Sequence, residues 1–284
     1  MDDAHPPWAA VREAVARSLA EDLGPLGDIT SALMPPALLA RGALVARGGG
    51  VFAGRRCVEE VFAQVDGSVS VEWRLDDGDA LAAGDGIAAV AGPARSVLTG
   101  ERSALNLACH LSGVASLTRL YVQAVAGTGC RILDTRKTTP GLRSLEKAAV
   151  RAGGGANHRG SLSDMVLLKD NHLAGLRIAE AVAAARRRWP MRTVEVECDR
   201  LGQVHEAVAA GAEVVMLDNM TPDEVAQGVA LVGGRALVEV SGGVNLDTVA
   251  AYAAAGADLV SVGALTASAP SFDIGLDLIA TGRN

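Results

Sequence analysis

Basic side chains that could bind an anion gather in one stretch of this chain. Residues 131–172 carry eight Lys or Arg against four Asp or Glu, although the whole chain has a net charge of −7. All the lysines of the sequence, Lys137, Lys147 and Lys169, lie in this stretch. A lysine ammonium is a compact charge that can contact a phosphate or carboxylate oxygen directly. A cationic cluster within an acidic protein predicts a pocket for a small, highly charged anion and argues against a nucleic-acid surface.

Carboxylates and glycines follow the basic residues along the chain. Glu197 and Asp218 stand downstream, and glycine-rich segments occur at 241–243 and 262–264. Backbone N–H groups in such late loops can approach a phosphate, whereas arginines favour carboxylates, which points to a polycarboxylate as a second ligand. Two carboxylates beside phosphates suggest Mg²⁺. The residue types alone predict a magnesium-assisted transfer or isomerisation of a phosphorylated substrate beside an anionic one. The basic residues expected to bind these anions are Arg136, Lys137, His158, Arg159 and Lys169.

The candidate site residues follow six apolar runs, and polar residues or glycines stand where each run ends. The elements formed by these runs therefore position the side chains. The runs are CRILDT, MVLLKDN, TVEVECD, VVMLDNM, ALVEVSGG and LVSVGALT, with helix-like segments between them. Apolar strands that alternate with helices predict a parallel sheet covered by helices. In barrels the active site lies at the carboxyl ends of the strands. Because the strands are fewer than eight, we expect an incomplete, open α/β barrel with its site at that edge; an open doubly wound sheet is the alternative.

The first part of the chain has a different pattern. Apolar residues at helical spacing predict an amphipathic helix over Trp8–Leu23, and short β-prone runs divided by glycines predict a small layer of three or four strands over 41–93. Two helices are expected next, over Ser96–Leu111 and Ala115–Val125, separated by a turn at 112–113. The charged pair Glu101-Arg102 on the first of them is typical of a solvated helix surface.

Composition bounds the class of protein. No run of about 18 apolar residues is present, which predicts no membrane span, and the N-terminus is acidic where a signal peptide would be basic. The four cysteines are widely spaced and form no CxxC motif, so reduced thiols are expected. We expect a cytoplasmic protein with no nucleic-acid or membrane partner.

Several motifs resemble a known family. DTRKTTPGLR, GGGANHR, LLKDNH, VEVE, MLDNM, SGGVNLDT and SVGALT, in this order, resemble the quinolinate phosphoribosyltransferase family (carboxylating nicotinate-nucleotide pyrophosphorylase), and GDIT and GERSALN extend the similarity upstream. The resemblance implies an N-terminal α/β sandwich over 1–113 and an open α/β barrel of about six to seven parallel strands over 114–270, with 271–284 packing back on the sandwich. It also implies a homodimer in which one subunit's N-terminal domain closes the other's barrel.

The same resemblance implies an activity in NAD biosynthesis and a role for each motif residue. The phosphoribosyl group of 5-phosphoribosyl-1-pyrophosphate would pass to quinolinate, with loss of CO₂, to give nicotinate mononucleotide and pyrophosphate. Lys137 and Lys169 would contact the sugar pyrophosphate, and Glu197 and Asp218 would hold Mg²⁺; Glu197 is preferred to Glu195, although alternation puts both on one side of the strand. These four residues are the expected catalytic set. Quinolinate would meet Arg136, His158, Arg159, Lys169 and, across the dimer, Arg102, and the 5-phosphate would meet Ser241, Gly242, Gly243 and Gly263.

Three positions depart from the family pattern. Ala148, Ser161 and Ala267 stand where the family commonly has tyrosine, glycine and histidine. They leave open a paralogue that uses a different heteroaromatic acid, or a non-catalytic phosphate-ligand binder. A barrel aldolase or decarboxylase with Lys169 as a Schiff base is a further alternative, although the neighbouring carboxylates argue against the neutral amine that such a lysine needs.

Overall fold

The computed structural model describes residues 4–281, which form two compact units. Unit 1 contains residues up to 119 together with 138–154 and the segment from 268 onward, and unit 2 contains 120–137 and 155–267. Residues 138–154, which contain α4 (Arg143–Ala152) and lie within the second domain expected from the sequence, pack in unit 1.

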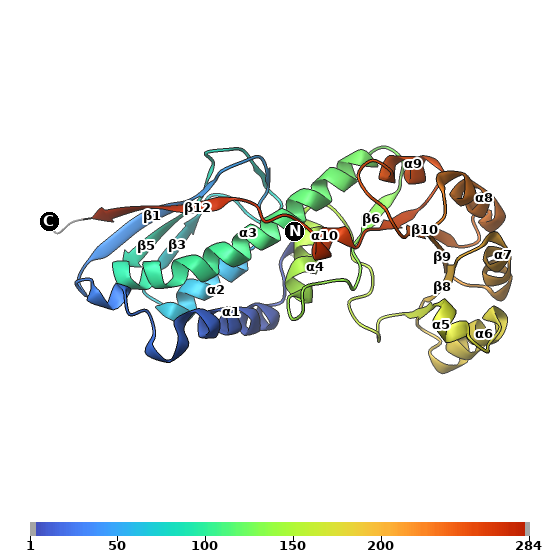
Figure 1. Ribbon diagram of the computed structural model, residues 1–284, viewed down its shortest axis with the longest axis horizontal. Coiled ribbons are helices and arrows are strands. Elements are labelled where there is room, and N and C mark those ends of the chain that lie inside the picture. The colour runs from blue at the N-terminus through green and yellow to red at the C-terminus, as the bar shows by residue number, and fades with distance from the viewer. Residues whose placement is uncertain (1–3, 282–284) are drawn as a thin grey trace. The chain divides into compact units, whose positions relative to one another are not determined.

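Unit 1 is an antiparallel sheet with helices packed beside it (Figure 1). The strand order is β12-β1-β5-β3, so the C-terminal strand β12 pairs with β1, near the other end of the chain. The elements are α1 (Trp8–Leu23), two short 3-10 turns (Gly24–Leu26 and Ser31–Leu33), β1 (Leu39–Ala46), β2 (Gly50–Val51), α2 (Arg55–Val65), β3 (Ser70–Trp73), β4 (Ala80–Leu81), β5 (Gly86–Pro93), α3 (Ala94–Ala124), which extends into unit 2, α4 and β12 (Ile274–Thr281).

The helix α3 corrects one prediction. Residues 94–124 form a single helix, so the expected turn at Ser112-Gly113 is wrong. Ser112 accepts a hydrogen bond from the Ala53 N–H (3.0 Å) and donates one to the Ala53 carbonyl (3.1 Å). A Cβ on Gly113 would lie 2.1 Å from the Pro270 carbonyl oxygen. The glycine therefore permits the close approach of another segment, and the polar pair is not a helix break.

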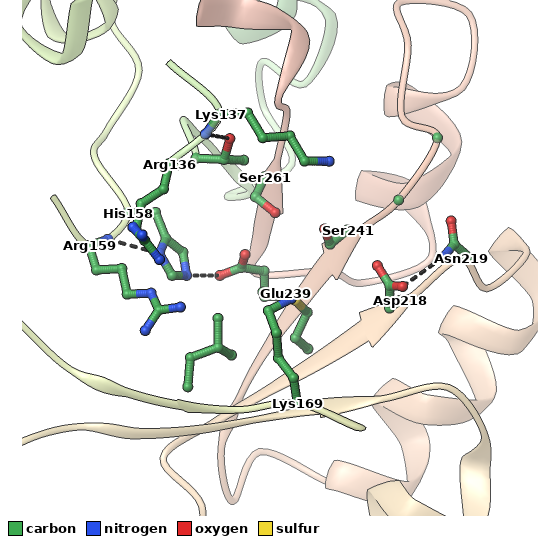
Figure 2. Close-up of a pocket in the computed structure, with 15 residues that line it drawn as sticks. Arg136, Lys137, His158, Arg159, Lys169, Asp218, Asn219, Glu239, Ser241 and Ser261 are labelled. Atoms are coloured by element: carbon green, nitrogen blue, oxygen red, sulfur yellow. Dashed lines mark hydrogen bonds and ion pairs between the residues drawn. The ribbon is translucent and has the colours of Figure 1, made fainter. Parts of the chain in front are cut away.

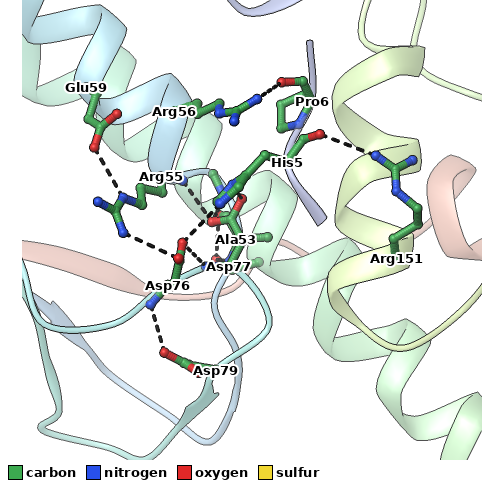
Figure 3. A network of polar contacts seen from close by, with 12 residues as sticks. His5, Pro6, Ala53, Arg55, Arg56, Glu59, Asp76, Asp77, Asp79 and Arg151 are labelled. Atoms are coloured by element: carbon green, nitrogen blue, oxygen red, sulfur yellow. Dashed lines mark hydrogen bonds and ion pairs between the residues drawn. The ribbon is translucent and has the colours of Figure 1, made fainter. Parts of the chain in front are cut away.

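The N-terminal segment is attached to unit 1 through a polar network (Figure 3). His5 Nδ1 lies 3.1 Å from Asp77 Oδ2. The other oxygen of Asp77 accepts hydrogen bonds from the N–H groups of Gly54 and Arg55, where α2 begins. These are among the amides that a helix leaves without an internal partner, so Asp77 caps α2 as well as holding His5.

Unit 2 is a six-stranded, all-parallel sheet in the order β6-β11-β10-β9-β8-β7. The two edge strands, β6 and β7, do not pair, so the barrel is open, as predicted. Figure 1 shows α7 and α8 along one side of β8 and β9. The elements are β6 (Arg131–Leu133), β7 (Val166–Leu168), α5 (Asp170–Leu173), α6 (Ile178–Arg188), β8 (Val194–Cys198), α7 (Leu201–Ala210), β9 (Val214–Asp218), α8 (Pro222–Val232), β10 (Leu237–Ser241), α9 (Val249–Ala254), β11 (Leu259–Ser261) and α10 (Ala264–Ala267).

Alternation along the central strands separates the core from the site. In β8, Val194, Val196 and Cys198 are fully buried on one face, and Glu195 and Glu197 project from the other. Valine-rich strands favour this pleated, buried setting. The apolar face packs against helices, and the acidic side chains are left on the face opposite those helices. In the described residues 4–281, no helix is both long and apolar enough to cross a membrane.

Candidate active site

A cavity of about 560 Å³ opens at the carboxyl ends of the parallel strands of unit 2 (Figure 2). Most of the residues singled out from the sequence line it: Arg136, Lys137, His158, Arg159, Lys169, Asp218, Ser241, Gly242 and Gly243. They meet because the strands are parallel, so every loop that follows a strand starts from the same edge of the sheet.

Three basic side chains form one side of the pocket. Figure 2 shows Arg136, His158 and Arg159 close together, across the pocket from Asp218 and Asn219. Burial and the neighbouring Arg136 guanidinium lower the pKa of Arg159. Arginine nevertheless stays charged at any ordinary pH, so two like charges face the same partly buried space. A bound anion would relieve that repulsion.

His158 is held by acidic residues beneath the pocket. Its Nε2 lies 3.0 Å from Glu195 Oε2 and 3.6 Å from Glu239 Oε2. Burial lowers the pKa of His158, but the hydrogen bond to Glu195 and the nearby acidic groups outweigh burial, and the net shift is upward. The Arg159 N–H donates to Nδ1 (2.8 Å), which requires a bare nitrogen there. This contact favours the neutral tautomer with its proton on Nε2, donated to Glu195.

The loop that carries His158 is fixed by a buried aspartate. Asp134 follows β6 and is fully buried. It accepts a hydrogen bond from the His158 N–H (2.9 Å) and another from the Asn157 amide (2.5 Å). Asp134 therefore positions the loop and is not itself among the residues that line the cavity.

Lys169 and Glu197 form an ion pair at the end of β7 and β8. Glu197 is nearly buried, whereas Lys169 is about half exposed and lines the cavity. A lysine held as an ammonium by a carboxylate is a poor Schiff-base nucleophile, since that chemistry needs the neutral amine. The ion pair therefore argues against the aldolase alternative.

Asp218 and the glycines after β10 meet through Asn219. The Asn219 amide donates to Asp218 Oδ2 (2.6 Å), and the Asn219 N–H donates to the Ser241 carbonyl (2.9 Å). Asn219 has a left-handed backbone (φ 56°), a conformation uncommon outside glycine. A Cβ on Gly242 would lie 2.3 Å from Asn219 Oδ1, so only glycine allows this approach.

Gly263 lies beneath Lys137 and does not line the cavity directly. A Cβ on Gly263 would lie 3.0 Å from Lys137 Cδ. The Thr266 hydroxyl donates to the Lys137 carbonyl (2.7 Å). These contacts position the backbone and stem of Lys137, while its ammonium remains exposed at the pocket.

The remaining predicted positions lie elsewhere. Arg102 is an exposed residue of α3 in unit 1. Ala148 is buried in α4, also in unit 1. Ser161 is exposed, and its hydroxyl donates to Asp164 (2.7 Å), so this departure from the family pattern shapes a surface turn.

Glu239 and Ser261 line the cavity although the sequence did not single them out, and Asn219, a residue that follows a predicted strand, had no expected role. Alternation offered a signal for Glu239, because it stands two residues before Ser241 in β10 and so projects from the same face of the strand. The backbone conformation of Asn219 had no comparable signal.

An open parallel barrel with a cationic pocket and glycine-rich strand ends defines an enzyme-type site for anionic, phosphorylated ligands. The models of the quinolinate phosphoribosyl transferase N-terminal and C-terminal domains match residues 28–112 and 114–277. The chain therefore belongs to the quinolinate phosphoribosyltransferase family.

Individual relatives are similar to this chain over almost its full length. The chain is 44% identical to the nicotinate-nucleotide pyrophosphorylase (carboxylating) of Mycobacterium leprae, covering 95% of this chain and 97% of the relative. It is 43% identical to the probable enzyme of the same name from Bacillus subtilis, covering 91% and 90%. The solved structure of nicotinate-nucleotide pyrophosphorylase from Francisella tularensis matches with a TM-score of 0.93 and 36% identity, over 98% of this chain and 99% of that one.

Proposed function

We propose that the unit 2 pocket binds quinolinate and 5-phosphoribosyl-1-pyrophosphate together. The enzyme transfers the phosphoribosyl group to quinolinate with loss of CO₂, giving nicotinate mononucleotide and pyrophosphate for NAD biosynthesis. The observation that carries this proposal is the convergence of five basic side chains, from three separate segments of the chain, on one cavity beside glycine-rich strand ends. One anion alone would not need both halves of this pocket.

Quinolinate is assigned to the cationic side. Arg136 and Arg159 offer planar donor groups that suit carboxylates, and Lys169 adds a third charge. Both ring nitrogens of His158 are engaged, with Glu195 and with the Arg159 N–H. We therefore assign the two substrate carboxylates to Arg136, Arg159 and Lys169. His158 would form the pocket wall between these basic side chains.

The sugar phosphate is assigned to the opposite side. Gly242 and Gly243 have left-handed backbones and lack side chains, so their N–H groups can approach a 5-phosphate closely. Ser241 adds a hydroxyl, and Lys137, whose position depends on Gly263, adds a charge toward the pyrophosphate.

The acidic residues suit Mg²⁺, which commonly takes one or two protein carboxylates and completes its shell with substrate oxygens and water. Asp218 faces the cavity, oriented by the Asn219 amide, and fits this role. Glu197 could join it if Lys169 moved from the carboxylate to a substrate oxygen. When bound, the ion would neutralise charge on the pyrophosphate leaving group.

The reaction has two steps, and the residues assigned above act in the first. Arg136 and Arg159 hold the dicarboxylate so that the ring nitrogen attacks the ribose carbon as pyrophosphate leaves. Lys137 and Lys169 stabilise negative charge that develops on the leaving group. The ring nitrogen then carries a positive charge, which stabilises the electron pair left on the adjacent carbon when its carboxylate departs as CO₂.

Incubation with quinolinate, phosphoribosyl pyrophosphate and Mg²⁺ tests the activity, with pyrophosphate and CO₂ as readouts. Arg136→Ala and Lys169→Ala should each lower kcat/KM roughly 10- to 150-fold, if the lost charge-assisted hydrogen bonds contribute about 1.5–3 kcal/mol. Arg187→Ala, an exposed arginine at the end of α6, is the matched control and should keep full activity. Absence of both products from the parent protein would refute the proposal.

Arg102 is assigned to a site shared between subunits of a homodimer. Its exposure on α3 supports this assignment, because a partner could reach it. If each site uses Arg102 of the partner subunit, mixing inactive Arg102→Ala and Lys169→Ala proteins should restore about a quarter of the parental activity, since half the dimers would be mixed and carry one intact site. No recovery after confirmed subunit exchange would exclude a shared site.

A further inference from the structure

Two carboxyl groups are buried together at the base of the pocket. Glu195 and Glu239 are 0% and 1% exposed and belong to β8 and β10, the two strands that flank β9. One oxygen of each, together with His158 Nε2, lies within a cluster whose atoms are all within 4.8 Å of one another. Two carboxylates so close in a buried setting cannot both stay ionised without a strong counter-charge.

The cluster is suited to a proton more than to a cation. The 3.0 Å separation of His158 Nε2 and Glu195 Oε2 is a hydrogen-bond distance, so a proton between these two atoms accounts for their approach. With its proton on Nε2, His158 donates to Glu195 and stabilises that carboxylate. Glu239 is then the group that must be neutral. Burial, and next the Glu195 charge, raise the pKa of Glu239 to about 8.

Glu239 also has a carboxyl oxygen that could contact a ligand. Its Oε1 is buried and, among the residues that the structure describes, has no hydrogen-bond partner. A buried polar atom in this state is uncommon and calls for an explanation. Figure 2 shows Glu239 between the basic side of the pocket and the side of Asp218 and Ser241. On the proposed assignment, this is where the pyridine ring joins the ribose.

The reaction needs a proton at that place. Breaking the bond between the ring carbon and its carboxylate releases CO₂ and leaves the electron pair on the carbon beside the quaternary nitrogen. That carbon must take one proton, and an acid beside it can supply the proton while CO₂ leaves. Arginine, lysine and serine are poor acids near neutral pH, and Asp218 is assigned to the metal. Other titratable or charged groups around Glu239 or its pocket are Arg136, Lys137, His158, Arg159, Lys169 and Glu195.

We propose that Glu239, kept neutral beside His158 and Glu195, donates the proton that replaces CO₂ on the pyridine ring. Its carboxyl O–H bond breaks and the new ring C–H bond forms while the bond to the departing CO₂ breaks, and the resulting carboxylate is reprotonated from water before the next turnover. The first step, formation of the bond to ribose, does not require this proton. The inference rests on the proposed function, and it assigns a general acid to the second step alone.

Glu239→Gln tests the proposal, because it keeps the shape and neutrality of the side chain but cannot supply a proton readily. The assay follows pyrophosphate and CO₂ separately in a single turnover with quinolinate, phosphoribosyl pyrophosphate and Mg²⁺. We expect pyrophosphate release within a few-fold of the parent and CO₂ release slowed about 100-fold or more, the usual contribution of a general acid. The mononucleotide of the intact dicarboxylic acid should accumulate. Glu206→Gln, an exposed acid on α7, should release both products at parental rates.

The outcomes separate this inference from the proposed function. If CO₂ keeps pace with pyrophosphate in Glu239→Gln, or if the folded variant loses both steps together, Glu239 is not the acid for the second step. If the parent makes neither product, the proposed function itself fails. A measurement on the parent covers the case of a variant that does not fold: single-turnover CO₂ release should slow as the pH rises above about 8, where Glu239 loses its proton. A rate that stays level through that range would overturn the proposal.

Discussion

Gly242 and Gly243 allow the packing at the end of β10 to be tested with two adjacent substitutions. Both have left-handed backbones, with φ values of 90° and 63°. A Cβ on Gly242 would lie 2.3 Å from Asn219 Oδ1 and 2.8 Å from the Asn219 backbone nitrogen. A Cβ on Gly243 would have no atom within 4 Å. The two alanine variants thus share backbone strain and differ in the clash.

The structure sets the expected magnitudes. Gly243→Ala should lower the free energy of unfolding by about 1–2 kcal/mol, the usual cost of a left-handed conformation for a residue with a Cβ. Gly242→Ala should lower it by an additional ~1–3 kcal/mol, because inserting a methyl group into a filled space forces neighbours to shift. The backbone nitrogen of Asn219 cannot rotate away, so its hydrogen bond to the Ser241 carbonyl should weaken as well.

Urea unfolding without ligands, followed by far-ultraviolet circular dichroism, measures this difference. Equal losses of stability in the two variants would refute the packing argument. Binding of phosphoribosyl pyrophosphate provides a second readout. Gly243→Ala should weaken it although this variant is the more stable of the two, since the new methyl group would project into the space assigned to the 5-phosphate.

Two further predictions concern pH. Glu239 has a pKa of about 8 in the folded protein against 4.5 ordinarily, so between these two pH values the folded state binds more protons than the unfolded state. The free energy of unfolding should therefore fall as the pH rises from 4.5 to about 8. Urea titrations of Glu239→Gln should lack this slope, and a parental slope in the variant would contradict the assignment. The hydrogen bond to Asp77 raises the pKa of His5, so His5 should stabilise the fold fully below about pH 6.5 and lose that contribution as the pH rises through its raised pKa. Thermal unfolding of His5→Gln should differ from the parent at acidic pH and converge with it at alkaline pH.

Much of the fold of unit 2 could be predicted from the sequence. Apolar runs with a helical segment between them indicate parallel strands, and parallel strands place their carboxyl ends along one edge. That rule was enough to predict that Arg136, Lys169 and Asp218 would meet, although they lie far apart in the chain. The same local reasoning failed at Gly113, because a glycine that admits a neighbouring backbone has the same signature as one that ends a helix.

The roles of the acidic residues were decided by the tertiary structure. Strand alternation puts Glu195 and Glu197 on the same face of β8, yet one contacts His158 and the other Lys169. The state of Glu239 depends on burial and on a carboxylate that projects from a different strand. A one-dimensional pattern can tell which side of a strand a charge occupies. Its partner, and therefore its protonation, is fixed only when distant segments fold around it, because desolvation and Coulomb interactions depend on distance in space.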